Sequence, residues 1–280
     1  MAVPQKVAAR IVAALKRFQP ILAAAKARDV NESDTVVIVT DLLQELFGYD
    51  KYTELTSEHA IRGTFCDLAI KGADGKPQLL LETKAIGVEL KDAHVKQAID
   101  YAANQGTDWV ILTSGLIWRV YKVVFAKPID QELVLELDLE KINPKSEDNV
   151  ELLWLLTKEG WQKGGLGDYH TQRRALSRFF LGAVVLSEPV VEVVRRELRR
   201  LSPGVKISVE EIEAALRHEV IKREVLEGDK HEEARKLVSR AAAKSRRNKK
   251  ERPSGDGEVE AVESVATEGS SDAGQPLPPS

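Results

Sequence analysis

Three charged side chains stand where the surrounding sequence is apolar. Asp67 interrupts the stretch Phe-Cys-Asp-Leu-Ala-Ile, while Glu82 and Lys84 close the stretch Leu-Leu-Leu-Glu-Thr-Lys-Ala. In an extended chain alternate side chains share a face, so Glu82 and Lys84 point to one side and Thr83 to the other. A Glu-Thr-Lys tripeptide alone is more often part of a solvated edge strand. Charges within an interior-type strand, however, are costly to bury and indicate a function.

The elements expected around these residues bring them together. Residues 65–70 and 78–83 are predicted strands, and the turn-rich residues 72–77 between them predict a hairpin. Asp67 would then approach the side of the sheet that carries Glu82 and Lys84. Two carboxylates and one ammonium would meet there.

The rest of the first half predicts an α/β fold with a mixed central sheet flanked by helices. A helix over residues 5–28 is expected to be interrupted at Pro20, and the next begins at Asn31, Ser33 or Asp34. The further elements expected are strands over residues 52–56, 109–113 and 118–124 and a helix over residues 90–105.

After Pro144 the pattern is helical. The expected helices cover residues 148–161, 172–186, 188–201 and 209–226, the last with a capping box formed by Ser208 and Glu211. From about residue 245 the chain is basic, then rich in Gly, Ser, Pro and acids, a composition typical of disorder. The predicted division is an N-terminal helical segment at 1–30, an α/β domain at 31–143, a helical region at 144–243 and a disordered tail at 244–280.

Composition narrows the function classes. The single cysteine and five scattered histidines cannot supply a standard zinc site, so a metal would be held by oxygen ligands. No apolar run is long enough for a membrane span and no signal peptide is visible, which predicts a cytoplasmic protein without a membrane partner. The net charge of −3 includes six acids within residues 253–280; without them the rest carries about +3, which is compatible with a polyanionic partner.

Asp67 followed about fifteen residues later by Glu82, Thr83 and Lys84 resembles the PD-(D/E)XK nuclease signature, with Cys66 where the motif has proline. Residues from about 33 to 125 are similar to the N-terminal domain of the restriction subunit of type I restriction enzymes and to its stand-alone relatives. This resemblance implies a restriction-endonuclease-like fold. No Gly-x-x-x-x-Gly-Lys-Ser/Thr sequence accompanies it, so the ATPase motor of a complete restriction subunit is not expected.

Gln97 and Tyr101 are four residues apart on an expected helix and would share a face. They match a Gln-x-x-x-Tyr motif that many nucleases of this group carry beside the catalytic site, where it contacts DNA or positions the lysine. Alone, such a pair is usually ordinary helix surface. Together with the other three residues it supports the resemblance.

The resemblance implies a magnesium-dependent deoxyribonuclease. Asp67, Glu82 and the carbonyl of Thr83 would bind Mg²⁺ or Mn²⁺, because these ions prefer oxygen ligands and retain several waters. Lys84 would orient or deprotonate the attacking water, or stabilise the developing charge, and a nearby cation would favour a lowered pKa of its ammonium. Some members of the family add an acid from the helix before the sheet, which makes Glu45 a candidate, with Glu54 a second.

Other basic residues are weaker candidates for phosphate contacts. They are His94, Arg62, Lys96 and the cluster Arg195, Arg196, Arg199 and Arg200, although charge runs are usually solvated helix faces. The expected partners are DNA and other restriction or defence subunits, and the oligomeric state is not predicted. Two further hypotheses remain, a catalytically silent nucleic-acid-binding protein on the same fold and an interaction module that recruits a partner through its charged tail.

Overall fold

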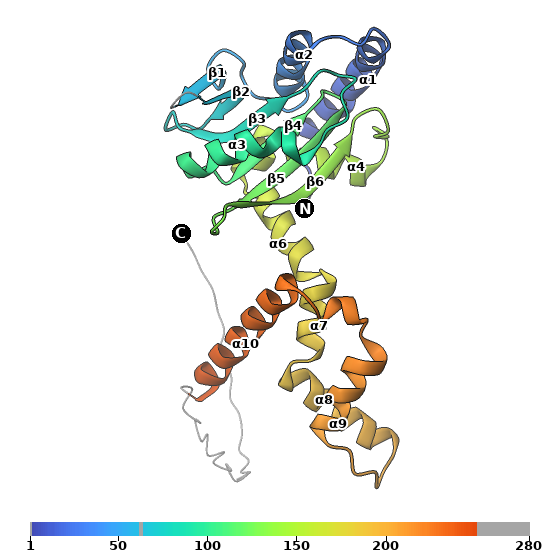
Figure 1. Ribbon diagram of the computed structural model, residues 1–280. Helices are drawn as coiled ribbons and strands as arrows, with labels where there is room; N and C mark the ends of the chain where they lie inside the picture. Colours follow the sequence, from blue (N-terminus) through green and yellow to red (C-terminus); the bar gives the residue numbers. More distant parts are fainter. Residues whose placement is uncertain (1, 62–63, 251–280) are drawn as a thin grey trace, which may run out of the picture. The chain divides into compact units, whose positions relative to one another are not determined.

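The computed structural model describes residues 2–61 and 64–250, which Figure 1 colours along the sequence. The chain divides into two compact units, Met1–Leu176 and Ser177–Ser280, and the sheet belongs to the first. The sequence-based division after residue 143 therefore differs from the compact units, because residues 144–176 pack with the sheet. The predicted disordered tail, residues 244–280, begins too early, because the chain is helical up to Lys250; residues 251–280 and Arg62 lie outside the described residues.

The first unit is built on one six-stranded mixed sheet, which confirms the predicted fold class. Its strands follow one another in chain order: β1 Leu55–Ile61, β2 Thr64–Lys71, β3 Pro77–Thr83, β4 Trp109–Thr113, β5 Ile117–Val124 and β6 Asp130–Asp138. Only β3 and β4 pair in parallel within this order, and α3 (Asp92–Gln105) connects them. A parallel pair requires such a crossover, whereas the other neighbours pair antiparallel through shorter connections.

Helices cover both faces of the sheet (Figure 1). On one face α3 packs against alternate residues of the strands, among them Ala69, Leu80 and Val110. The opposite face is covered by α1 (Gln5–Ala27), α2 (Glu32–Glu45) and α4 (Glu147–Trp154), whose apolar residues form one large cluster with Leu79 and Leu81. The central strands are thus buried on both sides, as their continuous apolar runs predict.

Local sequence signals determine where α2 begins and where α3 ends. The side chain of Asn31 caps α2 by accepting a hydrogen bond from the backbone N–H of Asp34 at 2.9 Å. α3 ends at Gly106, which takes the left-handed conformation with φ of 71°. The starting residue of α2 is therefore Glu32.

Two expectations for the first unit were wrong. Helix α1 continues through Pro20 instead of breaking there. Proline removes the hydrogen bond to the carbonyl four residues earlier, here that of Lys16, and both residues are exposed, so water can bind that carbonyl. The first strand starts at Leu55 rather than at residue 52, and β6 was not anticipated at all.

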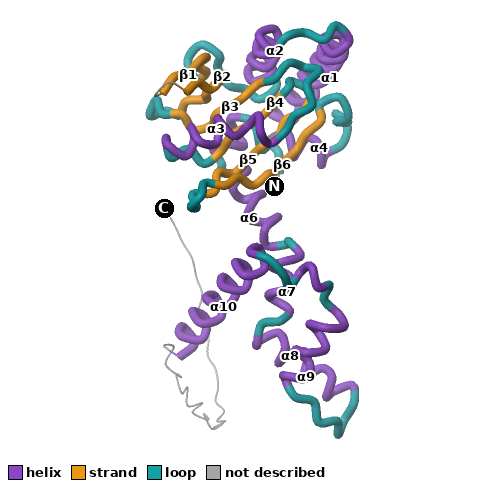
Figure 2. Tube along the Cα trace, in the orientation of Figure 1, coloured by secondary structure: helices purple, strands orange, loops and turns teal. Residues whose placement is uncertain are grey.

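From α4 onward the described secondary structure is helical, as Figure 2 shows. Three of the expected helices are divided. In two of them hydroxyl side chains act as internal caps: Thr157 accepts from Gly160 N–H and Ser177 from Phe180 N–H. The third, expected over residues 209–226, ends at Ala215 and is followed by two short turns. The resulting elements are α5 Lys158–Gln162, α6 Gly165–Ala175, α7 Arg178–Val185, α8 Glu188–Leu201, α9 Val209–Ala215, a short π-helical turn η1 Leu216–Val220, the turn η2 Arg223–Val225 and α10 Asp229–Lys250. Within the described range, none of the helices combines the length and apolarity needed to cross a membrane.

Candidate active site

The carboxylate of Asp67 is attached to the main chain of the neighbouring strand. The antiparallel register of β2 and β3 includes the pair Leu68 and Leu81, and beyond that pair the Oδ2 atom of Asp67 accepts the backbone N–H of Thr83 at 2.6 Å. The Sγ atom of Cys66 donates to the carbonyl of Leu81 at 2.9 Å. Side chains of β2 thus fix the end of β3. Glu82 lies in this end of the strand, and Lys84 comes directly after it.

Glu82 and Lys84 are joined by an ion pair that is largely withdrawn from water. The Nζ atom of Lys84 lies 2.8 Å from Oε1 of Glu82, and their side chains are 21% and 12% exposed. The same Nζ lies 3.5 Å from Oε2 of Glu32, the first residue of α2, whose side chain is 50% exposed. Lys84 therefore connects the end of β3 to the beginning of α2.

Glu82 points toward the face of the sheet that α3 covers. Leu80, two residues earlier on β3, packs in the cluster formed with α3, and alternation places Glu82 on the same face. The buried thiol of Cys66 belongs to that cluster. Burial is the main cause that raises the pKa of Cys66 to about 12, and the nearby charges of Glu82 and Asp67 add to it. The two carboxylates therefore lie near one another and near Cys66.

The charges of this cluster are unbalanced. Burial raises the pKa of Glu82, and the negative charge of Asp67 raises it further. The hydrogen bond and the positive charge of Lys84 lower it only in part. Burial alone would lower the pKa of Lys84, but its hydrogen bond to Glu82 and the carboxylates of Glu82, Glu32 and Asp67 outweigh this effect and raise it. Three acids thus surround one protonated ammonium.

The carboxylate oxygens of Asp67 and Glu82 are ligands of the kind that a hard divalent cation prefers, but only two side chains supply them. Within the ranges that the structure describes, no three His, Cys, Asp or Glu side chains are gathered so that they could ligate one ion by themselves. Asp67 and Glu82 offer carboxylate oxygens, and a surplus of negative charge that a cation would balance. Main-chain carbonyl oxygen and water would have to complete the shell, as is usual for Mg²⁺.

The two residues of the Gln-x-x-x-Tyr pattern differ in environment. Tyr101 is 3% exposed and packs in the cluster between α3 and the sheet, where burial raises the pKa of its hydroxyl and the nearby Cys66 adds to that effect. Gln97 is exposed on α3. Tyr101 is thus close to the same thiol that Glu82 and Asp67 influence, whereas Gln97 faces solvent one turn earlier.

The two additional acids proposed from the sequence form contacts elsewhere. Glu45, at the end of α2, pairs with Arg17. Glu54 pairs with Lys158 at 2.8 Å and accepts the backbone N–H of Asp50. The acid of α2 that contacts Lys84 is instead Glu32, which sequence analysis missed.

A signal for Glu32 was present in the sequence. Asn31 is a strong helix cap, and an acid directly after a cap lies at the opposite end of the 14-residue helix from Glu45, about 20 Å away. Which of the two ends adjoins β3 depends on tertiary packing. The helix was predicted, but its direction relative to the sheet was not.

Most of the weaker basic candidates have local partners. His94 accepts the backbone N–H of Lys91 at the start of α3, and Lys96 is exposed. On α8, the arginines contact groups near them in sequence: Arg195 binds Glu192, Arg196 and Arg200 bind Glu197, and Arg199 donates to the carbonyl of Ile207.

Comparison with known proteins gives one match. Residues 38–134 match the family model described as the type I restriction enzyme R protein N terminus. No curated protein and no solved structure is detectably similar to the chain. The matched segment runs from α2 to β6 and contains Asp67, Glu82 and Lys84, while Glu32 precedes it.

Proposed function

We propose that this chain, whose residues 38–134 are related to the N terminus of type I restriction enzyme R proteins, is a magnesium-dependent nuclease that hydrolyses phosphodiester bonds of DNA. The observation that carries the proposal is the convergence of Asp67, Glu82 and Lys84 at the end of β3, with more negative than positive charge. Other restriction or defence subunits are its proposed protein partners.

Asp67, Glu82 and the carbonyl of Thr83 are the proposed ligands of Mg²⁺ or Mn²⁺. When bound, such an ion supplies positive charge that neutralises phosphate oxygens and lowers the pKa of a water molecule. Asp67 is suited to this role because the N–H of Thr83 engages its Oδ2 atom at 2.6 Å and so fixes the orientation of the whole carboxylate. Glu82 is held equally firmly by burial and by Lys84.

Lys84 enters the proposed reaction as a cation. Its pKa is raised in the free protein, so the ammonium keeps its proton at neutral pH. An ammonium has three N–H donors: Glu82 accepts one of them at 2.8 Å, and Glu32 lies at ion-pair distance, 3.5 Å, near a second. A third donor remains to bind a phosphate oxygen or to orient the attacking water. This third donor supports the positioning role of Lys84.

The test is cleavage by the purified chain of labelled DNA and RNA, with Mg²⁺, with Mn²⁺ and with EDTA. Wild type is expected to cut DNA only with metal, and Glu82→Gln, which keeps the shape but removes the charge, is expected to cut at least about 100-fold more slowly. Glu136→Gln is the matched control, because Glu136 pairs with Arg119 on the same sheet and is 47% exposed. Equal cleavage by wild type and Glu82→Gln, or no cleavage of DNA by wild type with either metal, contradicts the proposal.

A further inference from the structure

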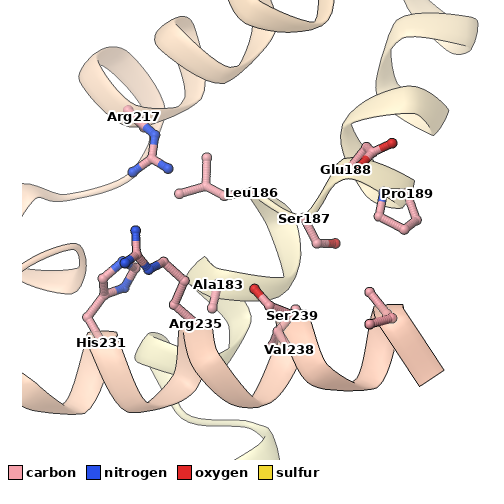
Figure 3. A pocket seen from close by; sticks show the side chains of 12 residues that line it. Ala183, Leu186, Ser187, Glu188, Pro189, Arg217, His231, Arg235, Val238 and Ser239 are labelled. Atoms are coloured by element: carbon pink, nitrogen blue, oxygen red, sulfur yellow. The ribbon is translucent and has the colours of Figure 1, made fainter. Parts of the chain in front are cut away.

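The unit Ser177–Ser280 contains a pocket of about 320 Å³, shown in Figure 3. Its walls come from the end of α7, the connection to α8, the turn η1 and one face of α10. None of the residues that sequence analysis singled out for catalysis lines it. Its lining combines basic side chains at one side with small apolar ones at the other.

Two arginines enter the pocket from different elements. Arg217 extends from η1 and Arg235 from α10, and Figure 3 shows their guanidinium groups reaching toward each other across the pocket. Arg217 binds Oε1 of Glu213 through Nε and Nη2, at 3.0 and 2.8 Å, and Arg235 binds Glu232 through Nη2 at 3.0 Å. A guanidinium has five N–H donors, so these bonds engage only part of each group. The remaining donors can bind a ligand.

A buried histidine lies beside these arginines. His231 is 4% exposed and lines the pocket, yet its Nδ1 atom has no hydrogen-bond partner among the described residues. A buried polar nitrogen without a partner has lost its hydration without a compensating bond, which is unfavourable. A ligand oxygen at this position would provide that bond.

The rest of the lining suits an uncharged organic group. Ala183, Leu186, Val238 and Ala242 supply apolar surface, and the volume exceeds what a lone phosphate needs. Glu188 also lines the pocket, and in Figure 3 its carboxylate lies on the side away from Arg217 and His231. The pocket thus has a cationic end and a mainly apolar end, which also holds Ser187, Glu188 and Ser239.

We propose that this pocket binds a small phosphomonoester, with the phosphate between Arg217 and Arg235 and next to His231. The planar fork of arginine matches phosphate oxygens, and each guanidinium keeps N–H donors that its glutamate partner does not engage. The apolar side chains would contact the organic part of the ligand. The site is separate from the residues of the proposed nuclease, so either proposal can fail without the other.

Isothermal titration calorimetry of the full chain with inorganic phosphate and with adenosine monophosphate, at constant ionic strength, tests the proposal. Adenosine monophosphate is expected to bind more tightly than phosphate, because the apolar side chains contact its organic part, and acetate is expected not to bind. Arg217→Gln and Arg235→Gln should each weaken binding about 10- to 100-fold, because each removes charge-assisted hydrogen bonds. Arg235→Lys keeps the charge but loses the planar fork, so its affinity should lie between that of Arg235→Gln and that of wild type.

Arg240→Gln is the matched control, since Arg240 is exposed on the same helix outside the pocket. It should bind like wild type, and circular dichroism should show that every variant keeps its helical content. Absence of binding by wild type to both phosphate compounds overturns the proposal. Equal weakening by Arg240→Gln, or none by the two pocket variants, overturns it as well, because binding would then reflect general charge.

Discussion

The charged cluster at the end of β3 and the arginine–glutamate pairs of α8 show two ways in which a folded chain holds charge. On α8, Arg195 and Arg200 each bind a glutamate three residues away, and the side chains are between 32% and 72% exposed. At β3, Lys84 contacts acids from two separate elements and is 21% exposed. The pairs on α8 follow from sequence spacing alone, whereas the β3 cluster exists only after folding.

The difference lies in charge balance and burial. Exposed pairs three residues apart are balanced and solvated, so they contribute little to stability or to binding. The cluster at β3 has three acids and one base, and burial opposes the charge of Glu82. A protein that tolerates such an arrangement loses stability there, which is typical of functional sites. Three substitutions sharpen this comparison.

The largest expected effect is on cleavage. Lys84→Ala should lower the rate of DNA cleavage about 100- to 1000-fold, because it removes the one ammonium of the cluster. Arg200→Gln should leave the rate within about twofold, since Arg200 is 72% exposed and pairs within its own helix. Rates are measured on labelled DNA at saturating Mg²⁺. A large loss in Arg200→Gln would mean that α8 is not merely a solvated surface.

A smaller effect separates the two ends of α2. Glu32→Gln should slow cleavage about tenfold, because Glu32 contacts Lys84 and helps to orient it. Glu45→Gln should cleave like wild type, since Glu45 pairs with Arg17 at the other end of the helix. The comparison uses single-turnover rates of the two variants. The reverse order of effects would restore the acid first expected from the sequence and remove Glu32 from the site.

The smallest expected effect is on stability. The pKa of Glu82 is raised in the folded chain, so wild type should lose stability as the pH rises from about 4.3, the value of an unperturbed glutamate, through the raised value. Glu82→Gln should lack this loss and melt about 2–4 °C higher at neutral pH without metal. Glu197→Gln, which removes an exposed partner of Arg200, should change the melting temperature by no more than about 1 °C.

Scanning calorimetry from pH 4 to 8 measures these melting temperatures. Mg²⁺ should raise the melting temperature of wild type but not that of Glu82→Gln, because a ligand stabilises only the state that binds it. If Glu82→Gln melts at a lower temperature than wild type at neutral pH, then Glu82 stabilises the fold, and its burial has a structural explanation.

Sequence patterns predicted the parts of the fold that depend on neighbouring residues. The turn between residues 72 and 77 and the two apolar runs around it predicted the β2–β3 hairpin, and Gly106 ends the predicted α3. Pro20 was misjudged because water can compensate a lost hydrogen bond on an exposed helix face. Two of the divided helices were misjudged because Thr157 and Ser177 were not recognised as caps.

For the candidate site, the limit is distance along the chain. Glu82 and Lys84 are two residues apart on one strand, so alternation alone predicted their contact. Glu32 and Lys84 are 52 residues apart in the sequence, with β1, β2 and β3 between them, and only the packing of α2 on the sheet brings them together. The family resemblance indicated an acid on this helix but did not specify its position.

Cys66 gives the chain a built-in probe of its own interior. It is the only cysteine in the sequence, it is fully buried, and its Sγ atom donates to the carbonyl of Leu81, directly before Glu82. A thiol reagent can reach it only when the sheet transiently opens there. The rate at which the reagent labels the native protein therefore measures how often β2 and β3 separate next to Glu82, without any engineered residue.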